Sequence, residues 1–192
     1  TITGNDYHGI YSAGGQLNVL NSIITNNSTE IYNYNENSNI SVSYSMVSNG
    51  YIGLGNIDAD PSFIDPANDD YRLSNSSSCI GSGNMTGDTP QTDIEGNLRP
   101  NPAGSKPDIG AYENPLASPI VNIPDPNLRA ALEQALGKNE GDAITKEDLA
   151  GLSGGLHASD ANISNLIGLE HCNTLTHLDL HSNQISDISV LS

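Results

Sequence analysis

Two histidines flank an aspartate near the end of the chain, with the spacing His-x-Asp-x-His at His177, Asp179 and His181. In a β-strand, alternate side chains share one face, and their Cα atoms lie roughly 6.5–7 Å apart. Neutral imidazole rings at that spacing could share a zinc ion. The alternative is an ordinary polar face that binds another protein. We favour it because no residues that would orient the imidazole rings are visible in the sequence. We therefore predict a protein-binding face and no metal site.

A second group of charged residues lies mid-chain in "TDIEGNLRPNPAGSKPDIGAYE", residues 92–113. We expect Arg99 to lie between the carboxylate of Asp93 and that of Asp108 or Glu113, as a structural cross-link. The alternative is an acid pair with an arginine clamp, as in a sugar-cleaving site. That reading needs a pocket and a carboxyl group with a shifted pKa, and the sequence indicates neither. We therefore predict a structural closing segment and no catalytic residue.

Five aspartates fall between Asp58 and Asp70, which raises the question of a calcium site. Their spacing does not match the EF-hand loop, which needs a fixed series of oxygen ligands and a glycine. Aspartates also cap turns by accepting hydrogen bonds from the backbone nearby, and we favour that role. We predict no cofactor, with calcium as the open alternative.

The charge and composition exclude several classes of partner. The net charge is −17, and no Lys or Arg precedes Arg72, so binding to nucleic acid or to an anionic membrane surface is disfavoured. No run of 18 apolar residues occurs, so we predict no membrane insertion. With one Phe and no Trp, the chain suits a thin core closed by polar turns, as in stacked coils. We expect Cys79 and Cys172 to be free thiols because they fall in different predicted modules.

The first module is predicted from two stretches, "LNVLNSIITNN" and "ISVSYSMVSNG", which align at an offset of 23 residues. The alignment places Leu17 over Ile40 and Val19 over Val42. Alternating apolar residues indicate strands with one buried face, and recurrence at this period predicts a parallel β-helix. Asn21 takes an inward position in the pattern, so we expect its side chain to hydrogen-bond along the stack.

The end of this module carries a family resemblance. Asp-Ile-x-Gly-x-x-Arg-Pro at 93–100 and Asp-Ile-Gly-Ala-Tyr-Glu at 108–113 resemble the closing block of bacterial right-handed parallel β-helix proteins, the broad pectate-lyase-like group. The resemblance implies an exported, often cell-surface protein. It implies no catalytic residue here, because the lyase-type residues belong to earlier coils. In the closing segment we expect Ile94 and Ile109 to plug the last coil.

The second module begins with helix signals. In "IPDPNLRAALEQALG", Asp125 is the predicted N-cap and Gly137 the predicted C-cap, and Thr145 is predicted to cap a second short helix. "LHASDANISNLIGL" and "LDLHSNQISDISVL" then align at an offset of 22, with Leu156 over Leu178. The second copy has the leucine-rich repeat pattern, in which Asn183 is expected to bond the backbone of the turn after the strand.

The 22-residue period and the helical pair before it resemble bacterial internalin-type leucine-rich repeat proteins. That resemblance implies a helical cap over the first repeat and a concave strand face that binds a protein partner. The face would carry His177, Asp179 and His181, with His157 beside Asp179 one coil away.

Together these patterns predict a mainly β solenoid. Residues 1–113 would be a right-handed parallel β-helix end with closing segment 58–113, followed by a linker at 114–122. Residues 123–192 would be a small α-helical cap and the start of a leucine-rich repeat domain, an α/β solenoid. Because the pattern starts and stops within a repeat, we expect a fragment of a longer chain.

The predicted function is binding, adhesion or display on a modular bacterial protein that is secreted or at the cell surface. The partners would be a protein on the leucine-rich repeats and a polysaccharide on the β-helix. The alternative is a polysaccharide lyase or glycoside hydrolase whose catalytic coils lie upstream. Residues 1–57 contain no Lys or Arg and only three acids, so we predict no catalytic activity in this fragment.

Overall fold

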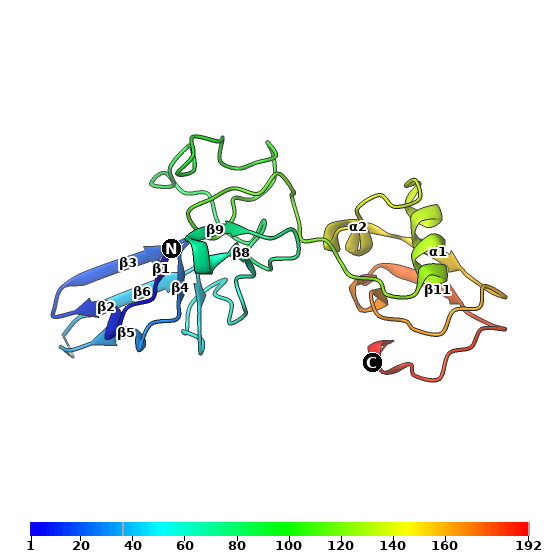
Figure 1. The fold of residues 1–192 in the computed structure, drawn as a ribbon, viewed down its shortest axis with the longest axis horizontal. Helices are drawn as coiled ribbons and strands as arrows, with labels where there is room; N and C mark the ends of the chain where they lie inside the picture. Colours follow the sequence, from blue (N-terminus) through cyan, green and yellow to red (C-terminus); the bar gives the residue numbers. More distant parts are fainter. Residues whose placement is uncertain (36, 192) are drawn as a thin grey trace. The chain divides into compact units, whose positions relative to one another are not determined.

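The computed structural model describes residues 1–35 and 37–191, and the chain forms two compact units, residues 1–119 and 120–192 (Figure 1). The first, the N-terminal unit, consists of short strands and turns. The second, the C-terminal unit, holds both α-helices of the described residues. Within the described residues, no helix is both long enough and apolar enough to cross a membrane.

The N-terminal unit is a set of coils, of which the first two turn through three short strands each and the next contributes one further parallel strand. Parallel pairing between coils produces three sheets, ordered β1-β4-β7, β2-β5 and β3-β6. The strands are β1 (Ile2–Thr3), β2 (His8–Ser12), β3 (Gln16–Leu20), β4 (Ile23–Thr25), β5 (Thr29–Asn33), β6 (Asn39–Ser43) and β7 (Met46–Val47).

The register of these strands confirms the pairing predicted from the spacing. Leu17 pairs with Ile40 and Val19 with Val42, in parallel. Because the pairing is parallel and in register, apolar side chains of one coil lie on those of the next. Val19, Ile24, Val42 and Val47 form the buried centre of this interior.

The coils turn at residues with left-handed backbone conformation, and this corrects the expectation for Asn21. Asn21 has φ 50° and lies at the corner between β3 and β4, not at an inward strand position. Its side chain bonds the backbone of Asn84: Nδ2 donates to the carbonyl oxygen and Oδ1 accepts from the N–H, both at 2.8 Å. It therefore ties the coil to the segment after residue 80 and does not bond along the stack.

A second apolar layer covers the outside of the β1-β4-β7 sheet. Neighbouring residues of a strand face opposite ways, so Ile23 points away from the interior that Ile24 fills. Ile23 and Met46 pack against a buried group from later in the chain, which comprises Leu73, Cys79, Ile80 and Ile109. The segment after residue 73 thus lies along the side of the coils.

The stretch from Asp58 to Asp70 differs from the parallel pattern before it. β8 (Phe63–Asp65) and β9 (Asp70–Leu73) pair antiparallel, joined by the 3-10 helix η1 (Pro66–Asn68). Two of the aspartates have the turn-capping role that we predicted. Asp60 accepts from the Ser62 N–H at 2.7 Å and Asp70 from the Arg72 N–H at 3.2 Å.

The C-terminal unit packs two helices against two parallel strands. Its elements are α1 (Pro126–Leu136), α2 (Lys146–Gly151), β10 (Gly154–His157), η2 (Leu169–His171), β11 (Leu175–Asp179) and η3 (Ser189–Leu191). The predicted caps are confirmed: Asp125 accepts from two N–H groups of α1, Gly137 ends α1 with φ 67°, and Thr145 forms a capping box with Asp148. Leu128, Leu132 and Leu149 are fully buried against the repeat leucines, so the helices shield the start of the repeats.

Candidate functional site

The candidate site is the exposed side of β10 and β11. The two strands pair in parallel, with Leu156 opposite Leu178 and His157 opposite Asp179, as predicted. Leu156 is buried in the core of the unit, so the residues beside it in the strand point outward. His157 and His177 are both exposed. The strand pair therefore presents imidazole and carboxylate groups on one face.

One expectation for this face is wrong. β11 ends at Asp179, so His181 does not continue the strand. Its ring reaches back to the strand instead, with Nδ1 2.7 Å from Oδ1 of Asp179 and Nε2 3.7 Å from Oδ2 of Asp160. The hydrogen bond with Asp179 raises the pKa of His181, and the same bond lowers the pKa of Asp179. The face therefore carries a hydrogen-bonded His–Asp pair.

Removing the carboxylate of this pair tests the arrangement. In Asp179→Asn, the pKa of His181 should fall toward its ordinary value, because the anionic acceptor that stabilises the imidazolium is gone. The pKa is measured by following the His181 ring resonances through an NMR pH titration. Asp160→Asn is the matched control and should lower the pKa less, because Asp160 is farther from the ring. Equal shifts in the two variants would contradict the pairing.

Asn183 holds the turn after β11 against the preceding coil, as predicted. Its Oδ1 accepts from the N–H of Ala161 at 3.1 Å and of Ile163 at 2.9 Å. Its Nδ2 donates to the carbonyl oxygens of Ala158 at 2.7 Å and Leu180 at 2.9 Å. One side chain thus satisfies backbone groups of both coils and fixes where the strand face ends.

No group of three His, Cys, Asp or Glu residues within residues 1–35 and 37–191 is arranged to hold a metal ion. His157, His177 and His181 are thus not gathered around a common point. Cys79 and Cys172 are both free thiols and lie in different units.

The closing segment contains a buried ion pair. Arg99 Nε lies 2.8 Å from Oε1 of Glu113, and both side chains are almost fully buried. The Nε–H direction does not meet hydrogen-bond geometry, so this contact is an ion pair without a hydrogen bond. A second guanidinium nitrogen of Arg99 donates to the Gly110 carbonyl oxygen at 3.0 Å. Glu113 is therefore the partner of Arg99 among the three carboxylates that we considered.

The other two carboxylates bind backbone N–H groups. Asp93 accepts from Glu95, Asn97 and Glu113 at 2.8–3.0 Å. Asp108 accepts from Gly81 at 2.8 Å and from Asn114 through its other oxygen. Burial raises the pKa of Asp108 to about 7, against the opposing effect of these N–H donors and of Arg99. Carboxylates occupied in this way cross-link the segment and are not presented to a substrate.

We expected Ile94 and Ile109 to plug the last coil, and this prediction is wrong for Ile94. Ile94 is 70% exposed and plugs nothing. Ile109 is fully buried, but it packs on Ile23 and Met46 along the side of the coils. The closing segment thus covers a sheet face.

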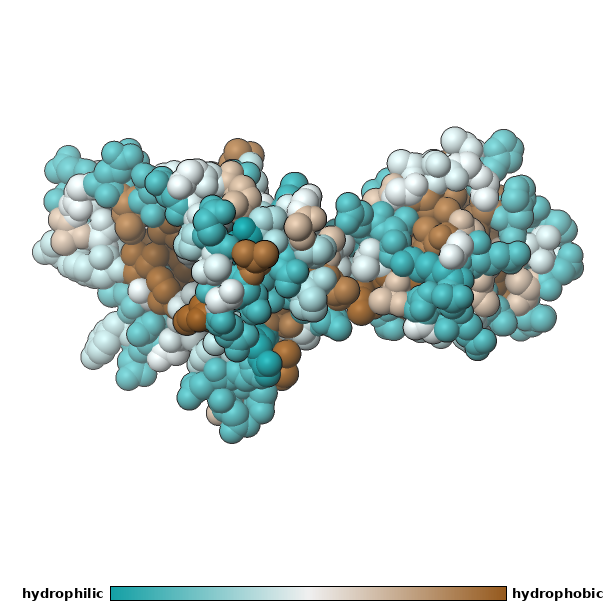
Figure 2. Space-filling model, turned by 90° about the horizontal axis from the view of Figure 1, so that it is seen from above, coloured by the Kyte–Doolittle hydropathy of each residue, from teal (hydrophilic) through white to brown (hydrophobic). Residues whose placement is uncertain are grey.

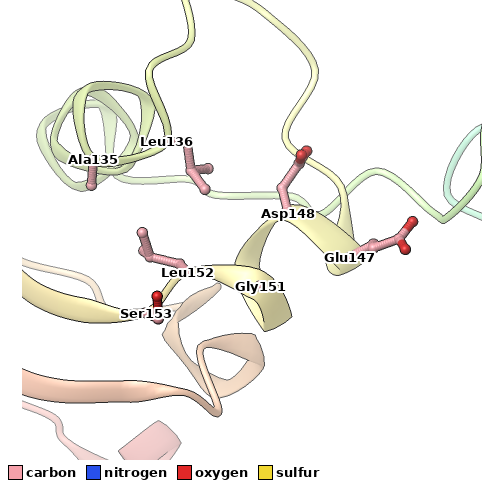
Figure 3. A pocket seen from close by; sticks show the side chains of 7 residues that line it. All are labelled: Ala135, Leu136, Glu147, Asp148, Gly151, Leu152 and Ser153. Atoms are coloured by element: carbon pink, nitrogen blue, oxygen red, sulfur yellow. The ribbon is translucent and has the colours of Figure 1, made fainter.

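Two pockets show how the surface of each unit is hollowed. In the C-terminal unit, a pocket of about 450 Å³ is lined by residues of α1, α2 and the chain that follows, including Leu136, Asp148 and Leu152 (Figure 3). Asp148 is already occupied by the Thr145 capping box and an ion pair with Lys138.

In the N-terminal unit, apolar side chains gather in a hollow (Figure 2), where a pocket is lined by residues that include Ile2 and Leu17.

Sequence reasoning recognised Asp125 as a helix cap but missed its second role. One oxygen accepts from the N–H groups of Asn127 and Leu128. The other accepts from the Ser164 N–H and hydroxyl group and from the Asn165 N–H. This carboxylate joins the helical cap to the loop after β10, and no spacing rule signals a contact across 39 residues.

Two solved structures are similar to part of this chain. An internalin (InlF) from Listeria monocytogenes is 32% identical over 36% of this chain, with a TM-score of 0.35. Internalin C2 from the same species is 38% identical over 35% of this chain, with a TM-score of 0.34. The matched parts span 21% and 30% of those two proteins. No protein-family model and no curated protein sequence matches the chain.

Proposed function

We propose that the chain is part of a modular bacterial protein, secreted or at the cell surface, whose C-terminal unit binds a protein ligand through the exposed face of β10 and β11. The N-terminal unit is the closing part of a right-handed parallel β-helix, which supports this module and presents a carbohydrate-facing surface. Neither role needs a catalytic group in the described residues.

The observation that carries the proposal is the outward display of polar side chains on a parallel strand pair. His157 and His177 are exposed, while Leu156 beneath them is buried in the core. Gly155 makes room for the imidazole ring of His157, since a Cβ atom at Gly155 would lie 2.8 Å from His157 Nε2.

An array of purified cell-surface protein ectodomains tests the proposal. The chain should bind at least one protein on the array, and the triple variant His157→Ala/His177→Ala/Asp179→Ala should bind about tenfold or more weakly, because residues at the centre of an interface dominate affinity. Glu140→Ala, an exposed change in the loop after α1, is the control and should bind normally. Undiminished binding by the triple variant would show that another surface makes the contact.

We do not favour the enzymatic alternative, although burial raises the pKa of Asp108 to about 7. The charged residues that could form an acid pair, Asp93, Asp108 and Glu113, are bound to backbone N–H groups or to Arg99. A glycan-cleaving role for this chain would need catalytic residues from elsewhere.

A further inference from the structure

A cluster of aromatic rings lies on the outer face of β2 and β5. Tyr11 and Tyr32 are register partners in the parallel pair, and their ring centroids are 5.8 Å apart with an interplanar angle of 20°. Tyr34 adds a third ring 5.7 Å from that of Tyr11. His8 stacks on Tyr32 with a centroid distance of 4.4 Å and an angle of 10°. These four residues, His8, Tyr11, Tyr32 and Tyr34, are the aromatic cluster.

The cluster faces solvent, and exposed aromatic side chains that adjoin one another mark a binding surface more often than scattered ones do. Tyr11 is 52% exposed, Tyr32 41% and Tyr34 67%. In the strands, Ile10 and Ile31 pack into the interior, so the neighbouring Tyr11 and Tyr32 point outward. Tyr34 follows the end of β5. The rings stack between neighbouring coils, and the cluster forms a surface of ring edges, ring faces and phenol groups.

The polar groups near the cluster indicate the chemistry of a ligand. The Nδ1 atom of His8 is buried and has no hydrogen-bond partner among the described residues. No Lys or Arg occurs before Arg72, so nothing in this stretch balances an anionic ligand. Of the three acids before Asp58, Asp6 is exposed, Glu30 is held by Asn27, and Glu36 lies outside the described residues. The described residues of the cluster offer aromatic rings and hydrogen-bonding groups, and the first 71 residues of the chain contain no Lys or Arg.

We propose that the aromatic cluster on β2 and β5 is a binding site for neutral oligosaccharide chains, which rests on the proposed carbohydrate-facing role of the N-terminal unit. Sugar rings present apolar C–H faces and hydroxyl edges. Tyrosines match both, since the ring contacts the C–H face and the phenol group bonds the hydroxyl edge. Tyrosine also contributes large contact area with little loss of conformational freedom, because it has two side-chain torsions. An acidic polysaccharide would meet no cation here and a protein of net charge −17.

Isothermal titration calorimetry with three probes tests this site: cellohexaose, xylohexaose and an oligogalacturonate of equal length. At least one neutral probe should bind, and the oligogalacturonate should bind more weakly or not at all. The double variant Tyr11→Leu/Tyr34→Leu should weaken neutral-probe binding by about tenfold or more, because exposed aromatic anchors carry most of such an interface. Tyr7→Leu removes a tyrosine that is 78% exposed and outside the cluster, and it should leave binding unchanged.

Two results would overturn the site. One is the absence of binding by both neutral probes, and the other is equal affinity in the wild-type chain and the double variant. If the oligogalacturonate binds and the tyrosine variants make no difference, the cluster fails as the site while a carbohydrate-facing role stands elsewhere. The near-UV circular dichroism of the remaining tyrosines shows whether the double variant is folded, and Tyr34→Phe, which keeps the ring, should retain most of the affinity.

Discussion

Arg99→Met is expected to lower the free energy of unfolding of the N-terminal unit by about 4 kcal/mol, because it leaves the Glu113 carboxylate buried without its cation. The guanidinium group also donates to the Gly110 carbonyl oxygen, and Gly110 in turn donates its N–H to Asn21 at the coil corner. Loss of Arg99 should therefore loosen the packing of the closing segment on the coils. All eight tyrosines precede residue 113, so urea unfolding followed by tyrosine fluorescence reports on this unit alone.

The destabilisation should depend on pH. Burial raises the pKa of Glu113 and of Asp108, and Arg99 opposes both shifts. Without Arg99 these folded-state pKa values rise further. A carboxyl with a raised folded pKa contributes stability below its unfolded pKa of about 4, and this contribution is lost as the pH rises through the folded value. The variant should therefore lose more stability at pH 8 than at pH 5.

Two further variants separate the buried ion pair from a general effect of removing arginine. Arg72 also pairs with a carboxylate, Asp70, but its side chain is 53% exposed, so Arg72→Met should change stability little. Arg99→Met/Glu113→Gln should cost less than the sum of the single changes, because neither partner is then left as a buried charge. Additive losses in the double variant, or a cost for Arg72→Met that equals that of Arg99→Met, would contradict the ion-pair account.

The strand register was predictable because alternation and a constant offset together decide which residues meet. Leu17 and Ile40 pair as the spacing indicated, and so do Leu156 and Leu178. Asn21 escaped the same reasoning, since the alternation stops at Leu20 and a left-handed corner follows. In a sequence alignment, a polar residue at a left-handed corner looks the same as a polar residue that points into the interior. Only the backbone conformation distinguishes the two.

The sequence patterns did not reveal contacts between segments far apart in the chain, and this limited the prediction of the sites. Of the three carboxylates considered for Arg99, Glu113 is the one that pairs with it. The exposure of Ile94 shows that the motif does not encode the direction of packing. The aromatic cluster was missed because Tyr11 and Tyr32 recur at 21 residues, whereas the alignment used an offset of 23. The corners between strands differ in length, so each sheet has its own offset between paired residues. An alignment with a single offset therefore misses the pair of Tyr11 and Tyr32.

Asp125→Ala is expected to lower the free energy of unfolding of the C-terminal unit by about 3 kcal/mol, because a helix cap and several charge-assisted hydrogen bonds are lost together. The carboxylate accepts five hydrogen bonds, two from the start of α1 and three from Ser164 and Asn165. Asp125 is 5% exposed, so water cannot readily replace it. Both α-helices of the described residues belong to this unit, so circular dichroism at 222 nm follows its unfolding.

The pH dependence gives a second measurement of the same carboxylate. Burial alone would raise the pKa of Asp125, but the hydrogen bonds from Ser164, Leu128 and Asn165 lower it to about 2. A carboxyl with a lowered folded pKa contributes stability above its unfolded value of about 4, and this contribution is lost as the pH falls toward 2. The wild-type unit should lose stability over this range, and Asp125→Asn should lose less over the same range because its amide does not titrate.

Asp187→Ala is the matched control, because Asp187 also accepts from a backbone N–H, that of Ser189, but on an exposed turn. It should leave the 222 nm transition nearly unchanged. Because the Asp125 carboxylate joins the helical cap to the loop after β10, its loss should also reach the candidate site. Amide hydrogen exchange at Leu156 and Ala158, whose N–H donates to the Asp179 carbonyl oxygen, should accelerate in Asp125→Ala and not in Asp187→Ala. Unchanged exchange in a clearly destabilised Asp125→Ala would show that the cap supports α1 alone and does not hold the strand face in place.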